Sequence, residues 1–368
     1  MKTTSYAGFE ITFLQFVFIL FGVQVGVAIL SLPRKLAEAA GTDGWISVLF
    51  GWFISSVASL IIVQVMKNGP EGTLPDIIAS YMGVWAGKAI ALLFSFYFCF
   101  LTVDGLAKTI LLTKTWLLPK TSSYILIILL LIPTYLIGRH GPRILGRYVE
   151  LVIILSLWIP IVYLMPLNNA HLLHLLPVLK KGWGPIFTGV QAMIYPSLGM
   201  VATFILYPYL KNKERAVSGV LLSNSLTMLI YLFMTLASFI YFSPDEITDY
   251  YNPIISVLKS IEFRFIERIE VPFIAFYLLV FSLVWIPSIY FATFFSSWMF
   301  DKSDNRVHLR YLCLAIVIVN YFYTPNYNQS TRMETWLSRI GFCLEYILPI
   351  CLLIYITLHN QLKRRSLS

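Results

Sequence analysis

The chain has 368 residues, of which 58% are hydrophobic and only 12% charged, and its mean hydropathy is +0.77. A soluble domain carries about 25% charged residues to keep its surface in water, so this composition excludes a soluble enzyme. The formal net charge of +9 does not indicate nucleic-acid binding, because the basic residues lie scattered in short connections and at the C-terminus.

The apolar residues recur in blocks of roughly 20 residues, the length that an α-helix needs to cross a bilayer. The blocks are apolar on every face, whereas the strands of a membrane β-barrel alternate apolar and polar residues. The sequence therefore predicts an all-α integral membrane protein with a single domain over residues 1–368 and ten transmembrane helices. In chain order, the predicted spans are 12–32, 45–66, 88–113, 123–138, 146–165, 186–207, 217–242, 272–299, 309–322 and 339–358.

Ten crossings place both termini on one side of the membrane. Lys and Arg are more numerous in the connections on that side, so the positive-inside rule predicts that both termini are cytoplasmic. The connection between spans seven and eight carries alternating charges from Glu262 to Glu270, a pattern that predicts an interfacial helix over 253–270.

The first span contains residues that interrupt a helix near its middle. Glycines lower helix stability and let the backbone leave helical geometry. The residues concerned are Gly22, Gln24, Val25, Gly26 and Val27. The alternative interpretation of Gly22 and Gly26 is a GxxxG face that packs closely against another helix.

The sixth span contains a second predicted break. Its residues are Tyr195, Pro196, Ser197, Leu198 and Gly199. Pro196 lacks a backbone N–H and clashes with the preceding helical turn. Spans one and six are five apart, and the longest spans (three and eight) and the shortest (four and nine) recur at the same interval. These features predict two five-helix repeats, 12–165 and 186–358, in opposite orientation, as in many secondary transporters.

Four residues are predicted to share one plane, because each lies near the middle of its own span: Gly22, Tyr97, Pro196 and Pro287. Helix breakers in spans one, six and eight at one depth, with Pro287 as the breaker in span eight, suggest exposed backbone groups that line a cavity. The half-helix beginning near Gly26 would direct its free N–H groups at an anion such as a carboxylate. Carbonyl groups freed between Tyr195 and Ser197 could accept from an ammonium group, so a zwitterionic amino acid fits both ends.

Span three carries an ionisable pair, Asp104 and Lys108, on the same helix face as Tyr97. Ionisable residues at this depth are candidates for proton coupling or cavity gating. The alternative is a structural pair in which Lys108 extends toward the membrane surface. Glu345 in span ten and Glu150 in span five are weaker candidates of the same kind.

Catalytic motifs such as HExxH, GxSxG and the Walker loop do not occur, so we predict neither an enzymatic activity nor a cofactor. His171 and His174 are spaced i,i+3, but no Cys or carboxylate near them in the sequence completes a metal site, and none is predicted.

Three segments resemble the B subunit of GerA-type spore germinant receptors: Gly22 to Pro33, Ala40 to Ser47 and Phe265 to Glu270. That family is similar to the amino acid-polyamine-organocation transporters, so the resemblance implies a LeuT/APC-like fold with ten helices in an inverted repeat. It also implies the inner spore membrane of an endospore-forming bacterium, with both termini on the core side. The implied role is nutrient sensing together with a membrane-embedded A subunit and a lipoprotein C subunit.

Carried onto this chain, the resemblance places the ligand, commonly an amino acid, at the two broken stretches, at Tyr97 and near Pro287 and Ser288. Transporters with a sodium site of this kind need oxygen-bearing side chains at mid-depth on span eight. Here Trp285, Ile286 and Pro287 leave only Ser288, so sodium coupling is not expected.

Three functions are compatible with these features. The first is a ligand sensor that passes a conformational shift to its partner subunits. The second is an amino acid symporter driven by protons through Asp104. The third is an assembly subunit without a ligand, which the aligned helix breaks disfavour.

Overall fold

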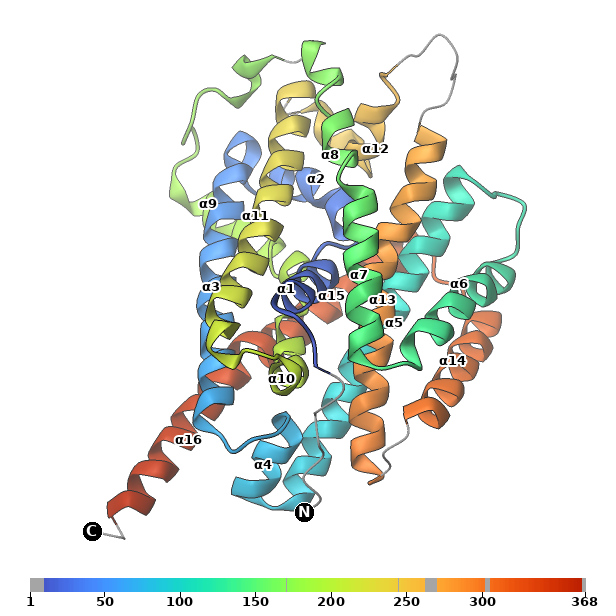
Figure 1. Cartoon of the computed structure of the whole chain (residues 1–368). Helices are drawn as coiled ribbons and strands as arrows, with labels where there is room; N and C mark the ends of the chain where they lie inside the picture. Colours follow the sequence, from blue (N-terminus) through green and yellow to red (C-terminus); the bar gives the residue numbers. More distant parts are fainter. Residues whose placement is uncertain (1–9, 170, 244, 262–269, 302–304, 366–368) are drawn as a thin grey trace.

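The computed structural model describes residues 10–169, 171–243, 245–261, 270–301 and 305–365, which form a bundle of α-helices (Figure 1). Thr12 and Gln15 form a capping box at the start of the first helix, and Gly83, with a φ of +90°, ends a short helix and precedes the longest one. The helices of the first half are α1 (Phe13–Gln24), α2 (Ala28–Ala40), α3 (Gly44–Asn68), α4 (Leu74–Met82), α5 (Val84–Trp116), α6 (Ser123–Gly138), α7 (Pro142–Ser156) and α8 (Ile159–Val162).

The second half contains shorter pieces around its first apolar block and long helices after it. A π-helical segment, Phe342–Ile347, connects the last two helices without a loop. The α-helices are α9 (Trp183–Ala192), α10 (Thr203–Leu206), α11 (Ala216–Tyr241), α12 (Pro253–Leu258), α13 (Glu270–Met299), α14 (Asn305–Phe322), α15 (Tyr327–Gly341) and α16 (Leu348–Arg365).

The predicted count of ten crossings is not confirmed. Within the described residues, six continuous helical stretches are long and apolar enough to cross a membrane, and a seventh is added if α9 and the segment up to Tyr209, bent by 50°, count as one span. Helix breaks explain part of the difference between ten predicted crossings and six or seven observed ones. For example, the break after α1 leaves that helix with only 12 residues, too few to cross a membrane alone. The predicted tenth span, 339–358, lies inside a longer helical stretch that begins at Tyr327.

Two details of the predicted elements are corrected. Pro287 does not break its span, because α13 is helical from Glu270 to Met299 with Pro287 inside it. One missing backbone hydrogen bond is tolerated there because α13 packs along α5 and is buried on most sides. The predicted interfacial helix 253–270 is shorter in the structure, where α12 covers only Pro253–Leu258. The rest of the prediction falls mainly on residues 262–269, which lie outside the described residues and include most of the Phe265 to Glu270 segment.

Helix α1 lies at the centre of the bundle and packs against α7, α11 and α13 (Figure 1). Its start is joined to the end of the sixth span, because the Ile11 N–H donates to the Tyr209 carbonyl at 2.9 Å and the Lys211 N–H donates to the Ile11 carbonyl at 3.2 Å. Helices α4 and α10 lie toward one end of the molecule, where α16 also extends, and α8 and α12 toward the other. The two broken segments are thus held side by side in the core.

Candidate ligand site at the helix breaks

The break in the first span lies where the sequence predicts it. Helix α1 ends at Gln24, Val25 leaves helical geometry (φ −84°, ψ 80°), and α2 begins at Ala28. The buried Gln24 side chain donates to Asn224 Oδ1 at 2.9 Å and accepts from Thr227 Oγ1 at 2.5 Å, so α11 holds this break by polar contacts.

Gly22 and Gly26 both face α13. A Cβ on Gly22 would lie 3.1 Å from the Leu283 Cβ, and one on Gly26 would lie 2.6 Å from the Val284 Cγ2. The glycines therefore allow close helix packing as well as a break, so the GxxxG interpretation and the break interpretation describe the same residues.

The break in the sixth span is sharper. After α9, Tyr195–Ser197 form one 3-10 turn, Leu198 is extended, and Gly199 has a φ of +116°. This backbone conformation is strongly unfavourable for a residue with a Cβ, and a Cβ at Gly199 would also approach the Val23 Cγ1 to 2.5 Å. Gly199 thus brings the second break against α1.

Tyr231 of α11 connects the two breaks. Its hydroxyl lies 2.7 Å from the Gln24 carbonyl oxygen, to which it donates, and 3.4 Å from the Pro196 carbonyl oxygen. The sequence analysis suggested that carbonyl groups freed at the sixth-span break could accept from an ammonium group of the ligand. In the structure, the Tyr231 hydroxyl is the hydrogen-bond donor to the carbonyl group at Pro196.

Glu345, which the sequence analysis treated as a weaker candidate, makes the main side-chain contacts to the sixth-span break. It lies in the π-helical segment with no exposed surface, and its carboxylate accepts from the N–H groups of Gly199 (2.8 and 3.0 Å) and Met200 (2.9 Å). It also accepts from the Tyr97 hydroxyl at 2.5 Å, which connects Tyr97 of α5 to the break. A lone carboxylate inside an apolar span was the signal in the sequence, since burying an unpaired charge is costly.

Asp104 and Lys108 belong to a larger network of charges. Lys108 Nζ lies 3.5 Å from Asp104 Oδ2, 2.8 Å from the Tyr195 hydroxyl and 2.9 Å from Glu334 Oε2. The Tyr195 hydroxyl in turn donates to Asp104. Lys35 of α2 forms an ion pair with the other oxygen of Glu334, so the network joins α2, α5, α15 and the sixth span.

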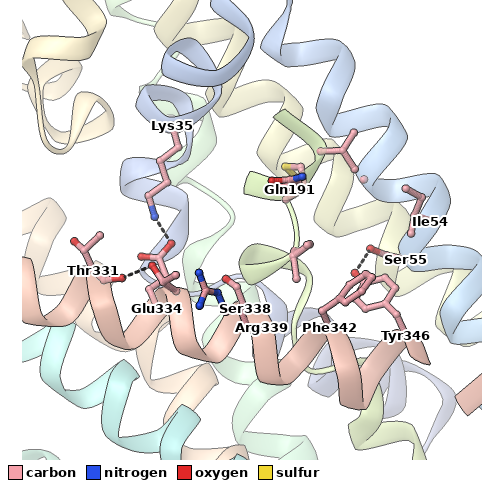
Figure 2. Close-up of a pocket in the computed structure, with 15 residues that line it drawn as sticks. Lys35, Ile54, Ser55, Gln191, Thr331, Glu334, Ser338, Arg339, Phe342 and Tyr346 are labelled. Carbon is pink, nitrogen blue, oxygen red and sulfur yellow. Dashed lines mark hydrogen bonds and ion pairs between the residues drawn. The ribbon is translucent and has the colours of Figure 1, made fainter. Parts of the chain in front are cut away.

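A pocket of about 650 Å³ lies between α2, α3, α9 and the helix that contains α15 and the π segment (Figure 2). Figure 2 shows the Lys35–Glu334 pair at one end and, at the other, Ser55 and Tyr346, whose hydroxyls are 3.0 Å apart. The lining residues are Lys35, Gly51, Ile54, Ser55, Val190, Gln191, Met193, Ile194, Thr331, Glu334, Thr335, Ser338, Arg339, Phe342 and Tyr346.

A second cavity, of about 10 Å³ and so large enough for a single water molecule, adjoins this pocket. Ser55 and Met193 line both cavities, and Gln24 and Ser197 line the small one. The pocket therefore ends next to the two breaks, separated from them by a few side chains.

The predicted site residues fall into separate groups. Gln24 and Ser197 line the small cavity, while Tyr97 and Gly199 contact Glu345. Ser288 is buried within α13 and donates to the Val284 carbonyl at 2.7 Å, and neither it nor Pro287 lines either cavity. The sequence analysis did not predict the three charged residues of the pocket, Lys35, Glu334 and Arg339, as site residues. Lys35 is far from the other two in the sequence, and no local pattern indicates that the three line the same pocket.

Sequence comparisons relate the whole chain to known proteins. A family model described as "Spore germination protein" matches residues 10–330. Spore germination protein GerQB of Bacillus cereus is 25% identical over 344 residues, which cover 92% of this chain and 93% of the relative. Spore germination protein A2 of Bacillus subtilis (strain 168) is 23% identical over 360 residues, which cover 95% of this chain and 96% of the relative.

Two solved structures share the fold. The crystal structure of MhsT in complex with L-phenylalanine superposes with a TM-score of 0.62 at 11% identity, covering 94% of this chain and 98% of MhsT. Mhp1, a nucleobase-cation-symport-1 family transporter in a closed conformation with bromovinylhydantoin bound, gives a TM-score of 0.64 at 14% identity, covering 91% of this chain and 76% of Mhp1. At these identities the likeness concerns the LeuT/APC-like fold alone.

Proposed function

The chain belongs to the spore germination protein family, and we propose that it is a germinant receptor subunit that binds a small nutrient, an amino acid, in the pocket beside the helix breaks. It is a multi-pass membrane protein with a transporter-like fold and B-subunit relatives. The proposed location is the inner spore membrane with both termini on the core side. The proposed partners are a membrane-embedded A subunit and a lipoprotein C subunit.

The observation that carries this proposal is the position of the pocket. On the proposed repeat boundaries, 12–165 and 186–358, its walls come from both repeats: α2 and α3 from the first, and α9 and α15 from the second. A ligand that contacts both repeats has a different affinity for each relative arrangement of them, so its binding shifts the population toward one arrangement. The Lys35–Glu334 pair links α2 to α15 at one end of the pocket, so a shift between the repeats would change this contact.

An amino acid symporter is the second candidate, and one observation favours it. Asp104 is fully buried, and its Oδ1 has no hydrogen-bond partner among the described residues. A buried carboxylate with a free acceptor position can take up a proton, as proton coupling requires. The other oxygen of Asp104 is held by Tyr195 and Lys108, which is the arrangement expected of a structural or gating role.

A germination assay tests the sensor proposal. Spores that lack this chain are compared with complemented spores over single nutrients and mixtures, and the response to a defined amino acid should disappear in the deletion strain. Val190→Trp fills the pocket and should abolish the response, whereas Phe187→Trp, one turn away on α9 and outside the pocket, should leave it intact. An immunoblot of spore membranes confirms that both variants are present.

The outcomes separate the candidates. Unchanged germination in the deletion strain, together with concentrative amino acid uptake into proteoliposomes that Asp104→Asn abolishes, would establish the transporter. A normal response of Val190→Trp spores at normal protein level would show that the ligand binds elsewhere.

A further inference from the structure

The anion-binding end of the sixth-span break is already filled by the protein. Backbone N–H groups at the start of a helix attract anions, because they are unpaired and lie at the positive end of the helix dipole. At this break, the N–H groups of Gly199 and Met200 donate to Glu345, and the Tyr97 hydroxyl completes the cradle. Glu345 therefore supplies from within the protein the anion that the N–H groups of the sixth-span break attract.

The π-helical segment explains how one element serves both the break and the pocket. Phe342 and Tyr346 of this segment line the pocket, while Glu345 between them is fully buried against the break. π-helical segments within α-helices are rare and often occur at functional sites. The segment thus separates a ligand in the pocket from the anion-binding N–H groups behind it.

Charge is concentrated at the opposite end of the pocket. Lys35 and Arg339 are the cationic side chains in its lining, and Glu334 is the acidic one. Glu334 is shared by Lys35 and Lys108, while Arg339 makes no ion pair with any residue in the described part of the chain and lies over the Trp336 ring at 5.7 Å. Arg339 is therefore available to pair with a carboxylate at this end of the pocket.

We propose that Glu345 acts as an internal carboxylate that occupies the N–H groups of the sixth-span break, and that the ligand is an apolar amino acid oriented with its carboxylate at Arg339 and Lys35 and its side chain toward this break. This inference rests on the proposed function and specifies the ligand class of the same site. The ammonium group of such a ligand lies beside its carboxylate, where it can form an ion pair with Glu334. The apolar side chain faces Met193, Ile194 and Phe342.

Chemical rescue tests the internal carboxylate. Glu345→Ala in the purified full chain should lower the melting temperature by about 5 to 10 °C, because it leaves buried N–H groups unpaired. Added acetate should restore much of the loss by replacing the missing carboxylate, whereas acetamide, equal in size but neutral, should not. Glu345→Gln keeps the shape of the side chain and serves as the second variant if Glu345→Ala does not fold; its melting temperature should also fall, without rescue.

The orientation of the ligand is tested on the same preparations with L-leucine and L-leucinamide as probes. L-leucine should raise the melting temperature of the wild type, L-leucinamide should not, and Arg339→Gln should lose at least tenfold in half-maximal L-leucine concentration. If no amino acid stabilises the wild type, the proposed function fails. If L-leucine stabilises the wild type but acetamide rescues Glu345→Ala as well as acetate, or Arg339→Gln binds L-leucine normally, the inference is overturned while the proposed function stands.

Discussion

At the scale of single residues, the site depends on positions where only one side chain is compatible with the backbone or with the charge of its neighbours. Gly199 has a φ of +116° and lies against Val23, so it sets both the direction of the chain and the distance between the two breaks. Glu334 has two lysines as partners in a largely buried environment, where an unpaired charge is costly.

Gly199→Ala should therefore lower the free energy of unfolding by about 2 to 4 kcal/mol, since the new Cβ adds backbone strain to a steric clash. Gly184→Ala is the matched control, because no atom lies within 4 Å of the new Cβ and its φ is ordinary. That change, inside α9, should be neutral or stabilising by about 0.5 to 1 kcal/mol. Chemical denaturation in detergent measures both, and equal stabilities of the two variants would contradict the role assigned to Gly199.

Lys35 and Glu334 should be energetically coupled. In a double-mutant cycle with Lys35→Met and Glu334→Gln, we expect a coupling energy of about 1 to 3 kcal/mol, because the two charges are shielded from solvent. The exposed pair Lys213 and Glu71, in contact at 3.0 Å, should show coupling indistinguishable from zero. Similar values for the two pairs would mean that Lys35 and Glu334 do not form a persistent link between α2 and α15.

At the scale of elements, two prolines near the middle of a span have opposite consequences. Pro196 lies in a 3-10 turn followed by a left-handed glycine, and the helix direction changes there by 50°. Pro287 lies inside the continuous helix α13. Proline by itself thus does not determine a break; the residues around it and the packing of the helix do.

Pro287→Ala should leave the germination response intact and should not lower stability, because alanine restores a backbone donor inside an unbroken helix. Pro196→Ala should weaken the response, since it favours helix through the break that Tyr231 and Glu345 stabilise. Germination dose-response curves and spore-membrane protein levels are the measurements. A lost response in Pro287→Ala spores would restore Pro287 to the ligand site that the sequence predicted for it.

At the scale of the whole molecule, the bundle places the connection after α3 and the end of α16 toward one end and the segment before α9 toward the other (Figure 1). This arrangement agrees with the predicted alternation, in which the connection after the second span and the end of the tenth lie on one side and the connection before the sixth lies on the other. The positive-inside rule predicts that the end that carries α4 and the C-terminal part of α16 faces the cytoplasm, which is the core in a spore.

Single-cysteine variants test this orientation in cells that express the full chain without its four native cysteines. Glu71→Cys and Gln361→Cys should react with a membrane-impermeant maleimide only in inside-out vesicles, and Lys180→Cys only in right-side-out vesicles. All three positions are exposed, so accessibility to the reagent is set by the membrane side. Labelling of Gln361→Cys and Lys180→Cys from the same side would overturn the orientation.

The sequence by itself determined the protein class, the approximate places of the apolar helices and both helix breaks. These are local properties: hydrophobicity over about 20 residues requires a bilayer, and Gly or Pro alters the backbone where it stands. Tertiary structure alone decided that Pro287 is tolerated, that Lys108 pairs with Glu334, 226 residues away, and that Glu345 fills the break. Such pairings arise because a buried charge must find a partner wherever packing places one, and that partner is not encoded in its sequence neighbours.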